Sequence, residues 1–171
     1  MAKTWSHKSK HSRENINKVI EKIRKALCNI VDGTDVQMEI CGSYRRGKEL
    51  CGDIDVLFKI STDEQWNKIL IAIHSISNEI LTHGLKKSNV LIDGIQVDIA
   101  FSYPDSWGTA VLHYTGPVEE NFRLRKIAKA KGLRLNEYGI TEVKSGKVNK
   151  FLFENEIYEF LKIDYVRPEK R

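Results

Sequence analysis

The sequence predicts an α+β fold, in which a mixed β-sheet with two packed helices is followed by a small C-terminal α/β lobe. Three observations support this prediction. Apolar residues recur at helical spacing in two long segments, shorter segments alternate between apolar and polar residues, and at Tyr103-Pro104-Asp105 the chain turns into a more basic, aromatic part. A chain of 171 residues has the length of one domain, or of two small lobes that share an interface.

The first lobe is expected over residues 12–103, behind a basic flexible tail over residues 1–11 that holds Lys3, His7, Lys8, Lys10 and His11. Ser12 is the expected cap of the first helix, whose apolar stripe comprises Ile16, Val19, Ile20, Ile23, Ala26, Leu27 and Ile30. A second stripe of this kind comprises Trp66, Ile69, Leu70, Ile73, Ile76 and Ile80. Both are interpreted as core stripes that pack beside the sheet.

Alternating segments predict the strands of the sheet. One runs from Val36 to Ile40 and breaks at the turn Gly42-Ser43, and another runs from Ile54 to Ile60 behind Gly52. Asp93-Gly94 predicts a hairpin turn that joins Val90-Leu91-Ile92 to the alternating segment 95–99.

The second lobe is expected over residues 104–171. A helix is predicted from Val118 to Lys131 and a closing helix from Glu154 to Leu161. Between them, Ile140 to Val143 and Val148 to Leu152 are predicted to pair as a hairpin around Ser145-Gly146.

Three aspartates are the candidate chemical groups. Asp53 and Asp55 flank Ile54, so their carboxylates share one face of the predicted strand. Two charges about 4 Å apart repel by about 4 kcal/mol at an effective dielectric of 20, and therefore need a proton, a basic partner or a cation. Magnesium takes oxygen ligands and keeps places for water and phosphate. Asp98 points away from the buried row of its own strand, so its carboxylate can join the pair from a neighbouring strand. For Asp53 and Asp55 alone, the alternative is an acidic strand end that faces solvent.

The turn in front of these aspartates has the composition of an anion site. Backbone amides at Gly42-Ser43 can face an anion, and Arg45 or Arg46 can supply the paired donors that phosphate favours. The run CGSYRRGKELCGDIDVLF therefore predicts an enzyme that handles nucleoside triphosphates.

Composition sets weaker limits. The chain has 28 basic and 23 acidic residues, a net charge of +5 that is compatible with a polyanionic partner. Its three cysteines lack zinc-site spacing, so we expect core-filling thiols in a reducing intracellular protein. Neither a stretch of about 20 apolar residues nor a secretory signal is present, so we expect a soluble protein without a membrane partner.

At these motifs the sequence resembles the family X DNA polymerases, the group of polymerase beta, within the nucleotidyltransferase superfamily. GSYRRGKELCGDIDVLF resembles the segment that carries the first two aspartates, and VDIAF resembles the strand with the third. HYTGPVEENFRLRKIAKAKGLRLNEYGI resembles the nucleotide-binding segment, and ENEIYEFLKIDYVRPEKR the carboxyl end. The resemblance covers about residues 13–171 and implies a catalytic palm over 12–103 with a nucleotide- and template-binding domain over 104–171, as in the minimal viral member of the family.

The resemblance also implies residue roles. The catalytic residues Asp53, Asp55 and Asp98 would hold two Mg²⁺ ions, for which Mn²⁺ can substitute. Arg45 has a weaker claim than Arg46 to the triphosphate, and a structural role is its alternative. The implied nucleotide-binding residues are Gly42, Ser43, Arg46, Gly52, Arg13, His113, Tyr114, Gly116 and Asn121. Basic residues cluster on the predicted second-lobe helix and just after it. Such a cluster is ordinarily a solvent-exposed helix face. Beside a nucleotide-binding motif we expect them to face DNA phosphates: Arg123, Arg125, Lys126, Lys129 and Lys131.

Some positions depart from the family pattern. His113 stands where polymerase beta has tyrosine, and Val118 replaces an aspartate near the base. Gln96 and Ala100 replace arginines that flank the third aspartate, so the arginine that would pair with Glu137 is missing.

The expected activity is DNA-directed addition of single nucleotides to a primer 3′-hydroxyl, in short-gap repair synthesis without a lyase step. Its partners would be gapped or primer-template DNA and deoxynucleoside triphosphates, and the protein is expected to be a monomer. One alternative is a template-independent nucleotidyltransferase that acts on RNA, a small molecule or a protein. Another is a binding module with an inactive site, against which the three intact aspartates argue.

Overall fold

A five-stranded mixed sheet forms the first lobe of the computed structural model, which describes residues 9–171. Its strands lie in the order β2 (Gln37–Ile40), β4 (Ile54–Lys59), β7 (Ile95–Ser102), β6 (Lys87–Ile92) and β5 (Glu79–His83). The central pair β4 and β7 is parallel, and the other neighbours are antiparallel. The predicted mixed sheet is confirmed.

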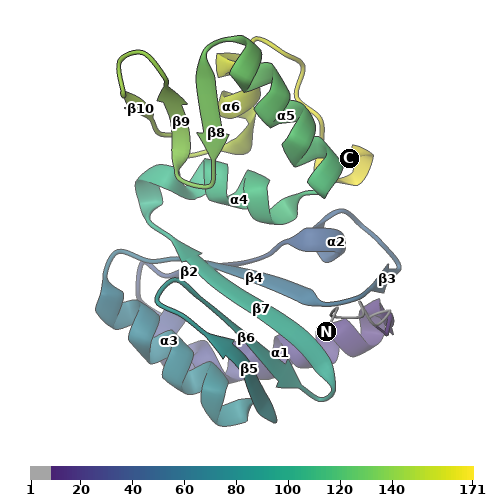
Figure 1. Ribbon diagram of the computed structural model, residues 1–171. Helices are drawn as coiled ribbons and strands as arrows, with labels where there is room; N and C mark the ends of the chain where they lie inside the picture. Colours follow the sequence, from purple (N-terminus) through teal and green to yellow (C-terminus); the bar gives the residue numbers. More distant parts are fainter. Residues whose placement is uncertain (1–8) are drawn as a thin grey trace, which may run out of the picture.

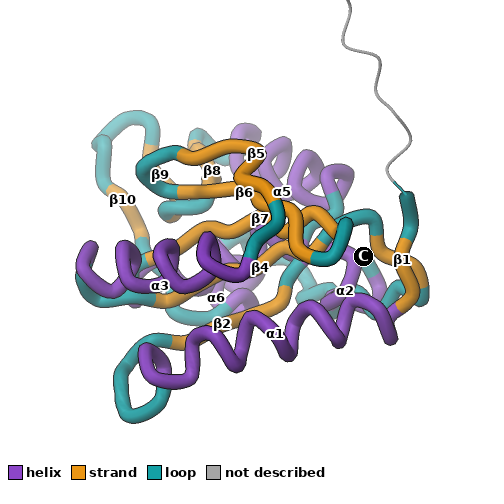
Figure 2. The backbone as a smooth tube through the Cα atoms, turned by 90° about the horizontal axis from the view of Figure 1, so that it is seen from below, coloured by secondary structure: helices purple, strands orange, loops and turns teal. Residues whose placement is uncertain are grey.

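Two amphipathic helices, α1 (Arg13–Val31) and α3 (Asp63–Ile76), cover one face of this sheet (Figures 1 and 2). The Ser12 side chain caps α1 as predicted, and Thr62 with Gln65 forms a capping box on α3. The predicted stripe of α3 extends one residue too far, because the helix ends at Ile76 and Ile80 lies in β5.

The turns of the first lobe follow the sequence closely. Asp93 and Gly94 have φ angles of 51° and 76°, the left-handed values that a two-residue hairpin turn requires, and they join β6 to β7 as predicted. A small additional sheet pairs β1 (His11–Ser12) with β3 (Leu50–Cys51). His11 therefore belongs to a strand and not to the expected tail, whose residues Lys3, His7 and Lys8 lie outside the described part of the chain.

The second lobe begins with a short 3₁₀ helix (Pro104–Ser106) and packs helices against a small antiparallel sheet. The predicted helices are α5 (Val118–Ala130) and α6 (Glu154–Phe160), and the predicted hairpin is β9 (Gly139–Glu142) with β10 (Val148–Asn149). The sequence did not reveal α4 (Trp107–Thr115) or β8 (Leu133–Asn136), which pairs with β9. A last 3₁₀ helix spans Pro168–Lys170.

Helix α4 lies between the sheet and the remainder of the second lobe (Figure 1). Each lobe has its own apolar core, and a third, smaller cluster joins them, in which Leu57 and Ala100 of the sheet pack against Ala110 and Val111 of α4. Helix α4 thus covers part of the sheet face opposite α1 and α3.

A charged bridge also joins the lobes. Arg45 donates to Glu154 over 2.6 Å and to the Thr115 hydroxyl over 2.8 Å, and Glu154 accepts from Arg171 over 2.9 Å. Arg45 therefore has a structural position, which was the alternative to a phosphate contact.

Two predictions from composition can be compared with the structure. Cys41 and Cys51 are buried as expected, whereas Cys28 is exposed and is not core filler. Across residues 9–171, no helix combines the length and the apolar character that crossing a bilayer requires.

Candidate active site

The sheet brings two of the predicted carboxylates to adjacent positions. Asp55 of β4 and Asp98 of β7 are register partners on parallel strands, so both side chains point to the face opposite α1 and α3. Asp53 comes directly before Ile54, the first residue of β4, and all three aspartates are half-buried.

The predicted turn in front of β4 is a single helical turn, α2 (Gly42–Arg45), that is fastened to the strand. The Cys41 backbone N–H donates to the Asp55 carbonyl over 2.8 Å. Gly42 has φ +56°, and a Cβ at this position would overlap the Asp55 carboxylate. Only glycine lets the turn lie this close to Asp55.

A cavity of about 350 Å³ separates this turn from the second lobe. One wall consists of Gly42, Ser43, Arg46, Asp53 and Asp55. The other comes from the end of α4 and the start of α5, with the lining residues His113, Tyr114, Thr115, Gly116, Pro117, Val118, Glu119 and Asn121. Its volume falls within the range of small-molecule sites.

Arg46 is held along the boundary of the two walls. Its Nη1 donates to the Thr115 carbonyl. Its buried Nε has no hydrogen-bond partner among the described residues, although buried guanidinium donors are ordinarily paired. An anionic oxygen in the cavity would satisfy such a donor.

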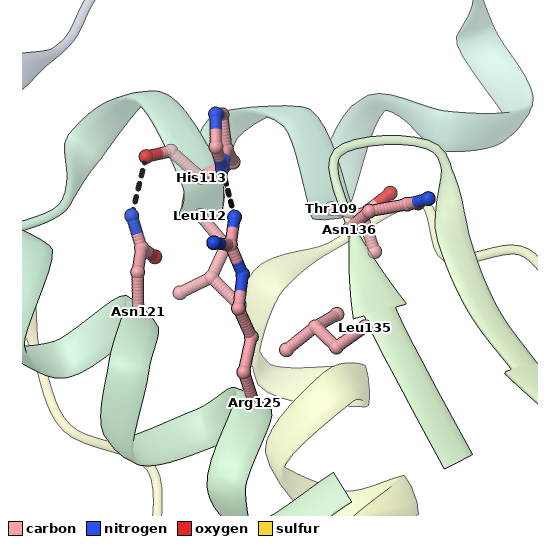
Figure 3. Close-up of a pocket in the computed structure, with 7 residues that line it drawn as sticks. All are labelled: Thr109, Leu112, His113, Asn121, Arg125, Leu135 and Asn136. Carbon is pink, nitrogen blue, oxygen red and sulfur yellow. Dashed lines mark hydrogen bonds between the residues drawn. The ribbon is translucent and has the colours of Figure 1, made fainter. Parts of the chain in front are cut away.

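A polar network positions side chains in the cavity wall formed by α4 and α5 (Figure 3). The Asn121 side chain donates to the His113 carbonyl over 2.9 Å, and Arg125 Nη2 lies 3.2 Å from His113 Nδ1. Because arginine only donates, Nδ1 must accept, and the neutral ring carries its proton on Nε2. The space enclosed beside these side chains is about 10 Å³, so the network positions residues and does not form a ligand cavity.

Burial tunes two side chains of this wall. It lowers the pKa of His113, an effect that the Glu137 carboxylate opposes and the cations Arg125 and Lys87 reinforce. It also raises the pKa of Tyr114 to about 12, so the phenol keeps its proton at neutral pH.

Asp98 is oriented from its own strand. Gln96 Nε2 donates to Asp98 Oδ1 over 2.6 Å, and both residues point to the same face of β7. Asp98 is not among the residues that line the cavity, whereas Asp53 and Asp55 are.

The donor set fits hard divalent cations, since it offers carboxylate oxygens on adjacent strands without a thiol or imidazole among them. In residues 9–171, no three His, Cys, Asp or Glu side chains converge closely enough to hold an ion as they stand.

Some predicted site residues lie elsewhere. Arg13 stacks on the Tyr44 ring at 3.9 Å and donates to the carbonyls of Tyr44 and Lys48, over 3.0 and 3.3 Å, so its guanidinium holds the loop behind the cavity. Gly52 is half-buried and does not line the cavity. The proposed nucleotide contacts of both residues stay predictions.

The predicted DNA-binding residues differ in their partners. Arg123 makes two hydrogen bonds of 2.7 Å to Glu120, and Arg125 contacts His113. Lys126, Lys129 and Lys131 are exposed at the helix surface and its exit. Sequence reasoning missed Thr115, Pro117 and Glu119 as lining residues. Their position between the predicted Tyr114 and Asn121 was the available signal.

Comparisons with known proteins agree with this geometry. A family model described as DNA polymerase beta palm matches residues 10–127, and one described as DNA polymerase beta thumb matches residues 110–171. The chain belongs to the family X DNA polymerases, the group of polymerase beta.

Family X relatives of very different length match this chain. Repair DNA polymerase X of African swine fever virus (isolate Warthog/Namibia/Wart80/1980) is 30% identical over 136 residues, which are 76% of this chain and 78% of the viral protein. DNA polymerase/3'-5' exonuclease PolX of Bacillus subtilis (strain 168) is 27% identical over 138 residues, which are 80% of this chain but only 24% of the Bacillus protein.

A solved family X structure shares the fold. The polymerase beta of Leishmania infantum, in a ternary P/T complex, has a TM-score of 0.83 at 21% identity, and the similarity covers 95% of this chain and 77% of that one. The palm-like α+β fold is therefore shown.

Proposed function

We propose that this protein is a DNA-directed DNA polymerase that adds single nucleotides to a primer 3′-hydroxyl in repair synthesis. The observation that carries the proposal is the cavity. Asp53, Asp55, Ser43 and Arg46 line one wall, and residues of the second lobe line the other. Transfer of a nucleotide from its triphosphate to a hydroxyl requires carboxylates that can hold metal ions beside side chains that bind phosphate. The names of the relatives, a repair polymerase and a polymerase with exonuclease, support the same class.

The residues of the chain would divide the work by position. Ser43 and the buried Nε of Arg46 would bind the triphosphate, and Tyr114 with Gly116 would face the sugar. Asp53, Asp55 and Asp98 would hold Mg²⁺ or Mn²⁺, and such ions, when bound, neutralise charge on the phosphates and activate the attacking hydroxyl. Gln96 would keep the Asp98 carboxylate pointed at the site.

The two apolar cores support a division into a palm over residues 12–103 and a C-terminal nucleotide- and template-binding domain over 104–171. Exposed Lys126, Lys129 and Lys131 are available to DNA phosphates, whereas Arg123 would first have to leave Glu120. We infer a monomer, and the three free thiols suit a reducing intracellular setting.

Primer extension tests the proposal directly. Recessed and one-nucleotide-gapped DNA would be offered each deoxynucleotide singly, with Mg²⁺ or Mn²⁺ and a ribonucleotide control. We expect incorporation directed by the template base, with the gapped substrate preferred. Incorporation that ignores the template would favour a template-independent nucleotidyltransferase instead. No incorporation on any DNA would contradict the proposed polymerase and leave the nucleotidyltransferase that acts on RNA, a small molecule or a protein.

A further inference from the structure

Strand β2 leaves one edge of the five-stranded sheet unpaired. It is a terminal strand of the sheet, and among residues 9–171 only β4 pairs with it. The Cys41 N–H donates to a carbonyl that continues β4, so the backbone groups of Cys41 and Glu39 point to β4. The N–H and C=O groups of Met38 and Ile40 therefore point out of the sheet.

A cavity of about 450 Å³ opens on the α1 face of this edge. Its apolar lining comes from Met38 of β2 and from Leu27 and Val31 of α1. The exposed thiol of Cys28 also lines it, whereas the other two cysteines of the chain are buried. The remaining lining residues are charged: Arg24, Lys25 and Asp32. Two cations against one carboxylate give this cavity an excess of positive charge.

A second cavity, of about 140 Å³, opens on the other face of the same edge. Side chains alternate along a strand, so Glu39 points away from the Met38 face, and it lines this cavity together with Arg45. The apolar lining comes from the second lobe: Trp107, Val111, Leu152 and Phe153. Leu152 and Phe153 are 51% and 62% exposed, so two consecutive apolar side chains stay uncovered beside the edge.

The two edge strands of the sheet differ in their ability to accept a further strand. Proteins commonly protect an exposed edge with a bulge that interrupts pairing. The register of β5 shifts between Ile80 and Thr82, whereas β2 keeps an unbroken register with β4. A furrow where a helix meets a sheet is the ordinary explanation of one such cavity. It does not explain a cavity on each face of one unprotected strand.

We propose that β2 is a docking edge for an extended peptide segment of another protein, which adds a strand to the sheet. Met38 and Ile40 would supply the backbone hydrogen bonds. Neighbouring residues of a strand point to opposite faces, so two adjacent apolar side chains of the peptide would enter the two cavities. A small molecule in one cavity would use neither the backbone groups nor the other cavity.

The charges beside the larger cavity define a further feature of the peptide. A residue two positions away on a strand returns to the same face. An acidic residue at that distance from the side chain in the larger cavity would therefore meet Lys25. Lys25 is exposed and forms no salt bridge within residues 9–171, whereas Arg24 pairs with Glu21 over 3.2 Å.

The docking edge is separate from the candidate active site. Neither of its cavities shares a lining residue with the cavity that contains Asp53 and Asp55. A bound peptide would therefore leave that site open, and it would attach the chain to another protein without stopping its reaction. The inference does not depend on the proposed function.

Selection from phage-displayed random peptides is the first test. We expect the enriched peptides to share two adjacent apolar residues, with an acidic residue two positions from one of them. A bulky maleimide on Cys28 fills the larger cavity without a change of sequence, because the other thiols are buried. Synthetic copies of the selected peptides should bind the labelled chain at least about tenfold more weakly. Failure to enrich such peptides, or equal binding to both forms, would overturn the inference.

N-methylated peptides test whether the peptide is added as a strand. Alternate amides of a strand face its neighbour, so methylation of every second amide removes the hydrogen bonds in one frame and spares them in the other. We expect the Kd, measured by fluorescence anisotropy, to rise by about tenfold or more in one frame and to change little in the other. Equal effects of the two frames would overturn strand addition.

Substitution of an exposed leucine tests the smaller cavity. Leu152→Glu places a charge in the apolar lining, so peptide binding should weaken by about tenfold. Leu85→Glu is the matched control, because Leu85 is 94% exposed and lines neither cavity. Unchanged binding by Leu152→Glu, or equal losses in both variants, would show that the peptide does not use this cavity and would overturn the inference.

A charge exchange tests the acidic residue of the peptide. Lys25→Glu should weaken binding by about threefold, and a peptide with lysine in place of its acidic residue should recover the loss. Lys68→Glu on α3 is the control, since Lys68 is exposed and lines neither cavity. The same response in both variants would contradict the proposed position of the acidic residue.

Competition with DNA separates the docking edge from the basic surface of the second lobe. An acidic peptide can also bind exposed lysines there by its charge alone. Primer-template DNA should not displace the selected peptide, and primer extension should continue at saturating peptide. Displacement by DNA would place the peptide on the basic surface and overturn the inference. A chain that binds the peptide but extends no primer would instead contradict only the proposed function.

Discussion

The two walls of the cavity are built in different ways. The sheet wall comes from one short segment, and its carboxylates are placed by strand register and by the close approach of Gly42 to Asp55. The opposite wall comes from α4 and α5, where His113 is held by Asn121 and Arg125 a helix away. Strand register leaves the carboxylates little freedom to move. Side chains held by hydrogen bonds can instead adjust when one member of the network is replaced. The sheet wall should therefore fail abruptly on substitution and the helical wall gradually.

The largest effect is expected from Asp55→Asn. The amide keeps the size of the side chain but removes a charge from the paired position Asp55 and Asp98, so nucleotide incorporation should fall by at least about a thousandfold. Single-turnover primer extension measures it, and Asp32→Asn at the exposed end of α1 is the control. If Asp55→Asn retained incorporation, the sheet wall would not be the reacting wall.

Glu154→Gln tests the bridge between the walls. Glu154 is buried between Arg45 and Arg171, whose side chains are 22% and 0% exposed. The change removes the carboxylate that both guanidinium groups share, and of its ion pairs Arg45 keeps that with Glu39 over 3.2 Å. Breaking a buried pair in this way costs about 3–5 kcal/mol, which denaturant unfolding would show. Glu159→Gln on the exposed face of α6 should cost far less. Equal losses would mean that the bridge contributes nothing beyond its surface neighbours.

The sheet wall was also the part that the sequence predicted best. Alternation fixed the shared face of Asp53 and Asp55, and Asp93-Gly94 fixed the hairpin that carries Asp98. The pairing of Asp55 with Asp98 could not be derived in this way, because these parallel strands are joined by a long crossover and only the tertiary structure sets their register.

On the helical wall the sequence predicted α5 but not α4, for a physical reason. Helix α4 is buried on nearly every side between the two lobes, so it lacks the amphipathic stripe that reveals a surface helix. Strand β5 has the opposite property: all of its residues are exposed, so no alternation marks it, and Ile80 instead continued the spacing of α3. The resemblance supplied His113, Tyr114 and Asn121, which line the cavity. Arg13 contacts the loop at Tyr44, and its nucleotide contact stays a prediction.

Gly42→Ala separates backbone strain from close contact. Gly33 has the similar φ of +76° with no atom near its missing Cβ, whereas a Cβ at Gly42 meets the Asp55 carboxylate. Both substitutions should cost about 1 kcal/mol of stability through strain. Gly42→Ala alone should also lower the kcat/KM for nucleotide addition, by about tenfold or more, because Asp55 must move. Equal activity of the two variants would show that the position of Asp55 tolerates the displacement.

The smallest effect is expected from protonation of His113 on the helical wall. Burial lowers the pKa of His113 below that of the unfolded chain, so the unfolded state binds the extra proton first as pH falls. The stabilisation is complete above the ordinary histidine value of about 6.5 and is lost as pH falls from there toward the folded pKa. Protonation also removes the acceptor that Nδ1 offers to Arg125.

Unfolding free energies at pH 7.5 and 5.5 would show this loss, and His113→Gln should reduce it. His74 is a second half-buried histidine whose pKa burial lowers, so His74→Gln serves as the matched control away from the cavity. Acid should weaken template DNA binding in the unmodified chain and in His74→Gln but less so in His113→Gln, because only His113 contacts Arg125. The pKa of His113 can be measured by NMR. A pKa at or above the ordinary histidine value would contradict the expected loss of stability in acid, because burial would then not disfavour the charged ring.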